Sequence, residues 1–436
     1  LDALNDFMCS MLPSGCCITE DMIYTIRAIR FVDSLCFIEK CAEGERGLGN
    51  RIVVGAAALV DPAPTFLSLS KEQERAPKKC TGGISDRITA YTGDAQGESE
   101  ETSVSLSKAP IRIAVFSESS EFASTRIRID SPLRALPYLF SLEHYYSNAE
   151  TLPEADVYII QRHPVSSHLY EQLIKAQALG KKIVFDLDDL LTDLPAENPH
   201  RTYFVQLRPL LMEQMKKSDM LVVSTETLRQ ALHSVNENIQ VFPNYLDPGL
   251  FVASKREHVR QTDKVRILLA GTPTHSMDFK LIESALSALI RDRGDSLEFV
   301  QFGVDLPIDW SASQVRKLPF YKDYYEYVKI LKDLEIDLAL VPLAENPANR
   351  CKSNIKWLEF SACGIPGIYS DIEPYHNIEN WLTGVRVPNT SQAWYDAIRI
   401  LMDQVSLRRR IGENALQEMQ QNWDLPSHLH IFASFY

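Results

Sequence analysis

The sequence lacks any run of about 18 apolar residues, the length needed to cross a membrane as a helix. Its first residues also lack the pattern of a signal peptide. These absences predict a cytoplasmic protein without a transmembrane span, and peripheral association with the inner face of a membrane stays open. The chain begins at Leu1 and not at methionine, which favours a piece of a longer protein such as a multidomain synthase.

Cysteine is present, but the repeated spacing of a structural metal site is missing. Most of the eight cysteines fall in the first 80 residues. We interpret them as free thiols, although zinc binding near Cys16 and Cys17 stays open. We expect no metal ion in the functional site.

A broad basic charge is absent as well, because the formal net charge is -13 at pH 7. Nucleic-acid binding needs a basic surface to neutralise phosphates, so no nucleic-acid partner is expected. A hydrophobic content of 45% and a charged content of 24% are typical of a globular protein. At 436 residues the chain is long enough for two or three domains, each with its own core.

The chain divides by composition into four parts. Residues 1–80 show no periodic pattern long enough to assign, and residues 81–109 are rich in glycine, serine and acidic residues, which predicts a flexible linker. From Ile111 onward, short apolar strands alternate with amphipathic helices. This predicts an α/β fold with two tandem Rossmann-like, doubly wound domains, residues 110–250 and 251–436. Ligands lie beyond the carboxyl ends of such strands, so both sheets are expected to face a common cleft.

The most informative segment runs from Asn349 to Asp371. Read as one helix that ends at Gly364, it places Lys352, Lys356 and Glu359 on a single face. The alternative is a surface helix with an ordinary pair between Lys356 and Glu359. The flanking strands and the turn after Gly364 favour a functional site.

Cations and backbone N–H groups gather at the start of this helix, which follows a predicted strand. Together they are suited to hold a diphosphate and to stabilise it as it leaves. Glu359 is expected to accept hydrogen bonds from ribose hydroxyls. The expected catalytic cations are Arg350, Lys352 and Lys356, and the expected ligand-binding residues beside them are Ser353 and Asn354.

The loop after the first strand of the second domain has one glycine and no GxGxxG, so a dinucleotide site is not predicted. Gly271 permits close approach of the backbone to a ligand, and Thr272 lies in the same loop. His275 is expected at the mouth of the cleft, bound to a phosphate or a sugar hydroxyl. An exposed histidine in a capping loop is an equal alternative.

Carboxylates end a strand of the first domain at Asp186, Asp188 and Asp189. One hypothesis is a divalent cation that carries a nucleotide diphosphate. Because the phosphate-type features lie in the other domain, we favour Asp186 and Asp188 as groups that orient an acceptor hydroxyl or act as a base. A polar strand end that caps the next helix remains an alternative.

The combined pattern resembles glycosyltransferases of the GT-B fold, in particular the family-four group of retaining, nucleotide-sugar-dependent enzymes. The resemblance covers about residues 111–425 and rests on five segments. These are residues 126–136, 184–189, 223–244, 271–278 and 352–371.

The resemblance implies a donor-binding second domain, an acceptor-binding first domain and no obligatory metal or cofactor. Glu359 matches the second glutamate of the family's E-x7-E motif, but Cys351 stands at the position of the first. The arginine and lysine that the family carries in its first donor loop are also missing from residues 271–278. The chain is therefore similar to a divergent branch.

The expected function is transfer of a hexosyl or deoxyhexosyl group from a nucleotide diphosphate sugar to a glycan or lipid-linked acceptor. Synthesis of cell-surface polysaccharide is the expected setting. Two alternatives stay open: a nucleotide-sugar 2-epimerase of the same fold, and a non-catalytic GT-B module that binds glycan or serves as a scaffold.

Overall fold

A computed structural model describes residues 109–252, 264–306, 311 and 314–435, together with the backbone of five strands between residues 34 and 104. Cys16 and Cys17 lie outside the described residues. The chain divides into two compact units, Leu1–Ala109 and Pro110–Tyr436. The second unit starts where the sequence predicts the first Rossmann-like domain.

The first unit contains an antiparallel sheet in which neighbours in sequence are neighbours in space. Two of its strands lie in residues 81–109, which the sequence analysis predicts to be a flexible linker; that assignment stays a prediction. Isoleucine, threonine and tyrosine in one of these segments favour a strand despite the surrounding glycine and serine. The strands are β1 (Ser34–Glu39), β2 (Ile52–Ala58), β3 (Thr65–Ser70), β4 (Arg87–Gly93) and β5 (Ser99–Val104).

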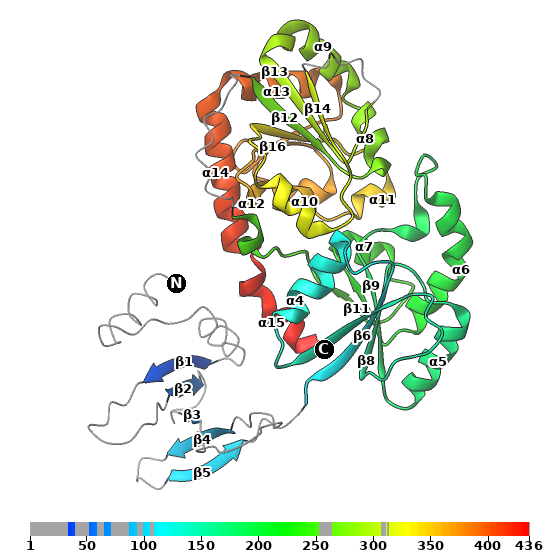
Figure 1. The fold of residues 1–436 in the computed structure, drawn as a ribbon, viewed down its shortest axis with the longest axis vertical. Coiled ribbons are helices and arrows are strands. Elements are labelled where there is room, and N and C mark those ends of the chain that lie inside the picture. The colour runs from blue at the N-terminus through cyan, green and yellow to red at the C-terminus, as the bar shows by residue number, and fades with distance from the viewer. Residues whose placement is uncertain are drawn as a thin grey trace, which may run out of the picture. The chain divides into compact units, whose positions relative to one another are not determined.

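The second unit has two halves, each built on a six-stranded parallel sheet (Figure 1). In the first half the strand order is β11-β10-β9-β8-β6-β7. The central strands β8 and β10 are buried along their whole length, as expected for a sheet covered on both faces. The strands are β6 (Ile111–Ser117), β7 (Phe140–Tyr146), β8 (Val157–Gln161), β9 (Lys182–Leu187), β10 (Met220–Val223) and β11 (Ile239–Val241).

Helices connect these parallel strands. Between β6 and β7 a short helix widens into a π-helical turn at Arg126–Asp130, where Ser131 N–H donates to the Arg126 carbonyl, before it continues as α4. Ser166 and Thr225 accept hydrogen bonds at the starts of the next helices, as N-caps do. The helices are α3 (Ala123–Thr125), α4 (Ser131–Arg134), α5 (Ser167–Ala178), α6 (Arg201–Lys217) and α7 (Glu226–Ala231).

The second half repeats the design with strand order β14-β13-β12-β15-β16-β17. All neighbours are again parallel. Its strands are β12 (Val265–Ala270), β13 (Leu297–Phe302), β14 (Val315–Leu318), β15 (Leu338–Val341), β16 (Gly367–Ser370) and β17 (Val385–Val387). The helices between these strands are α8 (Ser276–Lys280), α9 (Glu283–Arg293), α10 (Tyr324–Leu331), α11 (Pro347–Arg350) and α12 (Ile355–Ala362).

Three helices end the chain, and the last one returns to the first half (Figure 1). Helices α13 (Ser391–Asp403) and α14 (Val405–Asn422) pack on the second half, whereas α15 (Leu425–Phe435) lies against α4. The Phe432 ring lies 5.4 Å from the Phe242 ring, and His428 stacks on Tyr245 at 3.9 Å. Two stretches of chain therefore join the halves.

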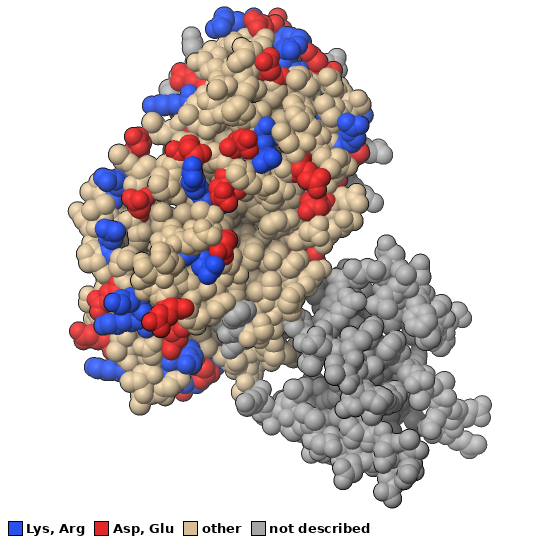
Figure 2. Space-filling view, turned by 180° about the vertical axis from the view of Figure 1, so that it is seen from behind, with Lys and Arg blue, Asp and Glu red and all other residues tan. Residues whose placement is uncertain are grey.

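The predicted pair of doubly wound sheets is confirmed. Within the described residues no helix is long and apolar enough to cross a membrane. On the described part of the face drawn in Figure 2, basic side chains lie among acidic ones and form no broad basic area.

Candidate active site

Each sheet has one point where the strand order reverses. The first sheet reverses between β6 and β8, and the second between β12 and β15. In open parallel sheets, ligands bind outside the carboxyl ends of the strands at such switch points. The loops after β12 and β15 therefore frame a candidate site in the second half.

The loop after β12 is held close to its neighbours. A Cβ atom at Gly271 would lie 3.2 Å from Cδ2 of His275, so the histidine ring packs over this glycine. Gly303 has a φ of 76°, and a Cβ atom there would overlap the Gly271 carbonyl oxygen. Glycine is thus required at Gly303 to let the backbone of Gly271 approach. Thr272 is exposed, and its hydroxyl hydrogen-bonds with that of Thr274.

Asp278 joins the two loops of the switch point. Its Oδ2 lies 2.8 Å from Nδ1 of His275, and its Oδ1 accepts from the Ala344 N–H and the Asn349 side chain. Burial lowers the pKa of His275, and the nearby Lys352 and Lys356 lower it further, although Asp278 acts in the opposite direction. His275 is therefore neutral near pH 7.

The segment from Asn349 to Glu359 is two helices and not one. Helix α11 ends at Arg350, and α12 begins at Ile355. The intervening backbone bonds to the first half, because the Thr225 hydroxyl donates to the Cys351 carbonyl. The predicted single helical face is therefore wrong, since Lys352 stands in the connection before α12.

Lys356 lies on the first turn of α12 beside Glu359. Lys356 Nζ lies 3.1 Å from Oε2 of Glu359, and the Tyr327 hydroxyl donates to the same oxygen. The Glu359 side chain is only 3% exposed. It serves as the counterion of Lys356, and both of these partners bind the same carboxylate oxygen.

Lys352 is shared between the halves. Its Nζ lies 3.3 Å from Oδ1 of Asp189, a residue of the first half. Arg162 also pairs with Asp189, at 3.1 Å. Burial acts to raise the pKa of Asp189, but Lys352 and Arg162 outweigh it and hold this pKa below its usual range. Asp189 is therefore ionised and competes with any anionic ligand for Lys352.

Asp188 pairs with Arg162, whose backbone adopts a left-handed φ of 61°. Burial raises the pKa of Asp188, and the charge of Asp189 raises it further, against the effect of Arg162. Asp188 thus lies in the same group of charges as Lys352, although the sequence analysis assigns it to the acceptor side, a role that stays a prediction. Its carboxylate is already in contact with a guanidinium.

Asp186 is placed differently from the prediction. It is 1% exposed, and its carboxylate accepts from Nε and Nη2 of Arg128 at 2.7–3.1 Å. Arg128 also donates to the Asn244 side chain, which donates to the Ser353 hydroxyl in the second half. In this structure Asp186 is buried against Arg128 and not exposed toward an acceptor, so its role as an acceptor-orienting group or base stays a prediction.

Two other expected residues complete the description. Arg350 is exposed and pairs with Glu345 near its own helix, so it does not join the cations of the site. Asn354 is the N-cap of α12, but its side chain accepts no capping bond, and its buried amide nitrogen has no partner. The N-terminus of α12 thus has no side-chain cap, which suits it to an anion.

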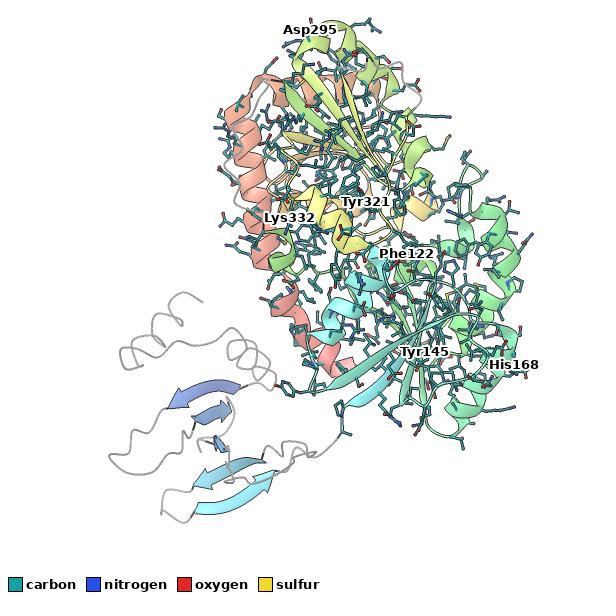
Figure 3. The ribbon with its side chains drawn as sticks, viewed as in Figure 1. Phe122, Tyr145, His168, Asp295, Tyr321 and Lys332 are labelled. Carbon is teal, nitrogen blue, oxygen red and sulfur yellow. The ribbon has the colours of Figure 1, made fainter. Side chains whose placement is uncertain are left out.

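The halves also meet beside α10. Phe122 and Tyr321 lie on the two sides of this meeting place (Figure 3). The amino group of the next residue, Lys322, lies 5.3 Å from the Phe122 ring centroid, and Tyr324 N–H donates to the Glu121 carbonyl.

The structure places His275 near Lys352 and Lys356, and Lys356 beside Glu359, whereas their role in binding a donor stays a prediction. Sequence reasoning names Asp189 only as a strand-end carboxylate, and it misses Asp278 and Arg162 as supports of these side chains. Their common signal is position, since each follows a strand that borders or lies next to a switch point. Within the described residues, no group of three or more His, Cys, Asp or Glu side chains could hold a metal ion.

No family model matches the sequence, and no curated protein is similar to it. Solved structures do match. Sucrose-phosphate synthase from Thermosynechococcus elongatus has a TM-score of 0.56 at 13% identity over 74% of this chain and 97% of its own.

The chain has the GT-B fold.

Two other GT-B matches have similar statistics. Anabaena HepE, solved in complex with UDP-glucose, has a TM-score of 0.55 at 13% identity over 74% of this chain and 98% of its own. A glycosyltransferase from Rickettsia africae ESF-5 has a TM-score of 0.54 at 13% identity over 76% and 98%. The predicted resemblance to GT-B glycosyltransferases is confirmed at the level of fold.

Proposed function

We propose that the chain is a nucleotide-sugar-dependent glycosyltransferase whose second half binds the donor. One observation carries the proposal: Lys352, Lys356 and the uncapped N-terminus of α12 lie near the loops at the switch point of the second sheet. A helix N-terminus and two cations are suited to a diphosphate. HepE, which has a similar fold, was solved with UDP-glucose.

The proposed chemistry needs charge stabilisation more than a nucleophile. As the bond between the anomeric carbon and the phosphate oxygen breaks, the diphosphate gains negative charge near Lys352 and Lys356. The acceptor oxygen then bonds to the anomeric carbon. In a retaining course, which the resemblance implies, the departing phosphate oxygen takes the acceptor's proton. His275 and Asp278 hold the loop against which the donor lies.

The sugar, the acceptor and the cellular setting are proposed from the sequence and its resemblance. We propose a hexosyl or deoxyhexosyl donor and a glycan or lipid-linked acceptor, in cell-surface polysaccharide synthesis at the cytoplasmic face of a membrane. Contact between Glu359 and the ribose also stays a prediction, since Tyr327 and Lys356 already bind one of the two carboxylate oxygens of this buried side chain.

Calorimetry with UDP, GDP and ADP, and with UDP-glucose, tests the donor site. We expect one nucleotide to bind, and Lys352→Ala and Lys356→Ala each to weaken it by about 1.5–3 kcal/mol, the usual value of a hydrogen bond to a charged group. Lys329→Ala is the matched control, because this lysine of α10 is 68% exposed and pairs only on its own helix. Its nucleotide affinity should equal that of the unmodified chain.

Three outcomes decide between functions. Absence of binding to every nucleotide overturns the proposal. Binding without transfer or hydrolysis favours the non-catalytic module. Conversion of the bound sugar to its C2 epimer favours the epimerase.

A further inference from the structure

The switch point of the first sheet also carries chemistry, and the proposed donor site does not use it. The loops that follow β6 and β8 border this point. They contain Glu118 and His163, and the first turn of α6 adds Tyr203 beside them. By the same topological rule that locates the donor site, a ligand of the first half should lie here.

These three side chains are close together. Nδ1 of His163 lies 3.6 Å from Oε2 of Glu118, and the His163 ring centroid lies 5.9 Å from that of Tyr203. Phe204 packs against the His163 ring from the same helix, at 5.2 Å. The histidine is thus fixed from one side by an aromatic ring and faces a carboxylate.

His163 is held ready for a polar partner. Its side chain is 13% exposed, and its buried Nδ1 makes no hydrogen bond, because the Glu118 oxygen is beyond hydrogen-bond distance. Leaving such an atom unsatisfied costs free energy, which a ligand hydroxyl would recover once the exposed Glu118 side chain shifts to admit it. Glu118 and Tyr203 are about half exposed, so a ligand can reach them.

The charges around the cluster disfavour an anion. Burial lowers the pKa of His163, and Arg162 and His200 lower it further, so the imidazole is neutral near pH 7 despite Glu118. Arg162 is already paired with Asp188 and Asp189, so its positive charge does not balance the charge of Glu118. Glu118 therefore leaves the cluster net negative.

A short chain of ion pairs connects this cluster with the donor cations. His163 directly follows Arg162, Arg162 pairs with Asp189, and Asp189 pairs with Lys352. The left-handed backbone of Arg162 lets consecutive side chains take different directions, one into the ion pairs and one toward Glu118. A ligand on His163 would thus lie on the acceptor side of the proposed transfer.

We infer that Glu118, His163 and Tyr203 form a subsite for an uncharged sugar residue of the acceptor. The exposed Tyr203 ring stacks on the apolar face of the sugar, as tyrosine does with ligands that have one apolar and one polar side. One sugar hydroxyl donates to the Glu118 carboxylate and accepts from the Nδ1–H of His163. The negative charge of Glu118 excludes acceptors with a carboxylate or phosphate at this position. This inference rests on the proposed function.

Saturation-transfer NMR on the full chain with UDP present tests the subsite. The probes are p-nitrophenyl glycosides of glucose, galactose, mannose and N-acetylglucosamine at millimolar concentration, and the matching glucuronide. We expect at least one neutral glycoside to bind and the glucuronide not to bind. Tyr203→Ala and His163→Ala should abolish the sugar-ring signals, and Glu118→Gln should let the glucuronide bind.

Two controls separate the subsite from folding and from the donor site. Tyr138→Ala removes a tyrosine that is 79% exposed in the turn before β7, and this variant should bind the glycosides normally. The exposed variants Tyr203→Ala and Glu118→Gln keep the test valid if the more buried His163→Ala does not fold. UDP affinity should be unchanged in all of them.

Several results would overturn the inference. They are no signal from any neutral glycoside, normal signals in Tyr203→Ala, or a glucuronide that binds the unmodified chain as well as the glucoside does. In contrast, glycoside binding by a chain that binds no nucleotide would leave the subsite standing and overturn the proposed function alone.

Discussion

The carboxyl ends of the two sheets differ in how far their paired charged side chains are buried. In the first half Asp186 is closed against Arg128, with both side chains at most 2% exposed. In the second half Lys352 and Lys356 remain 28% and 22% exposed, each with a carboxylate on one side. A closed pair supports the fold, whereas a cation with one open side can still receive an anion. This difference is why we propose the diphosphate site at the second edge.

Arg128→Ala, which removes the buried partner of Asp186, should cause the largest loss of stability among these variants. It leaves Asp186 buried without its counterion, which typically costs about 3–5 kcal/mol of unfolding free energy. Urea denaturation followed by circular dichroism measures the loss. The double variant with Asp186→Ala should recover part of it. A loss below about 1 kcal/mol would mean that Asp186 is free for chemistry after all.

Gly303→Ala should disturb the second edge by strain and not by charge. Alanine at a φ of 76° would press on the Gly271 carbonyl. We expect a loss of about 1–3 kcal/mol together with weaker UDP binding, because the loop of His275 is displaced. Gly180→Ala shares the positive φ but meets nothing within 4 Å, so it controls for backbone strain alone. Equal UDP binding in both variants would contradict the proposed role of the loop.

Asp189→Asn should leave Lys352 more available to an anionic ligand at the second edge. The change removes the carboxylate that occupies Lys352 in the free protein. For a partly exposed pair, we expect UDP to bind roughly two- to fivefold more tightly at low salt. The gain should shrink as salt screens the charges. The control is Asp219→Asn, which removes the carboxylate that pairs with Lys182 in the same half, and it should leave UDP affinity unchanged. A weaker UDP affinity in Asp189→Asn would show instead that Asp189 positions Lys352.

His275 should give the smallest effect, and it depends on pH. Its pKa is lowered in the folded state, so between the folded and unfolded pKa values the unfolded chain binds more protons. Stability is therefore full above the unfolded value of 6.5 and falls as the pH drops toward the folded pKa. Unfolding free energies at about pH 7.5 and about pH 5.5 should differ less in His275→Gln than in the unmodified chain. An unchanged difference would indicate that His275 is solvated.

The sequence predicts the interior of the fold better than its margins. Central strands such as β8 and β10 are short, mostly apolar runs, and the sequence predicts them at Ala155–Gln161 and Met220–Ser224, within two residues of their bounds. The edge strands β7, β14 and β17 mix polar and apolar residues because one side is open to solvent, and they are missed. Helix α15 is missed too, since its partners lie in the first half.

The site follows the same rule. Lys352 and Lys356 are visible in the sequence because they stand near a recognisable helix. The break between α11 and α12 is not visible, because Thr225 hydrogen-bonds there from more than a hundred residues away. Likewise a carboxylate at a strand end looks the same in sequence whether its partner is a buried arginine, as for Asp186, or a shared lysine, as for Asp189.

The returning helix α15 has a mechanical consequence. The two stretches that join the halves are hydrogen-bonded to each other, since Leu246 N–H donates to the Trp423 carbonyl and Leu425 N–H donates to the Leu246 carbonyl. Two connections fastened side by side restrict how the halves can turn relative to one another. Any rotation about Leu246 that separates the halves would stretch the contacts of Lys352 with Asp189 and of Thr225 with Cys351 together.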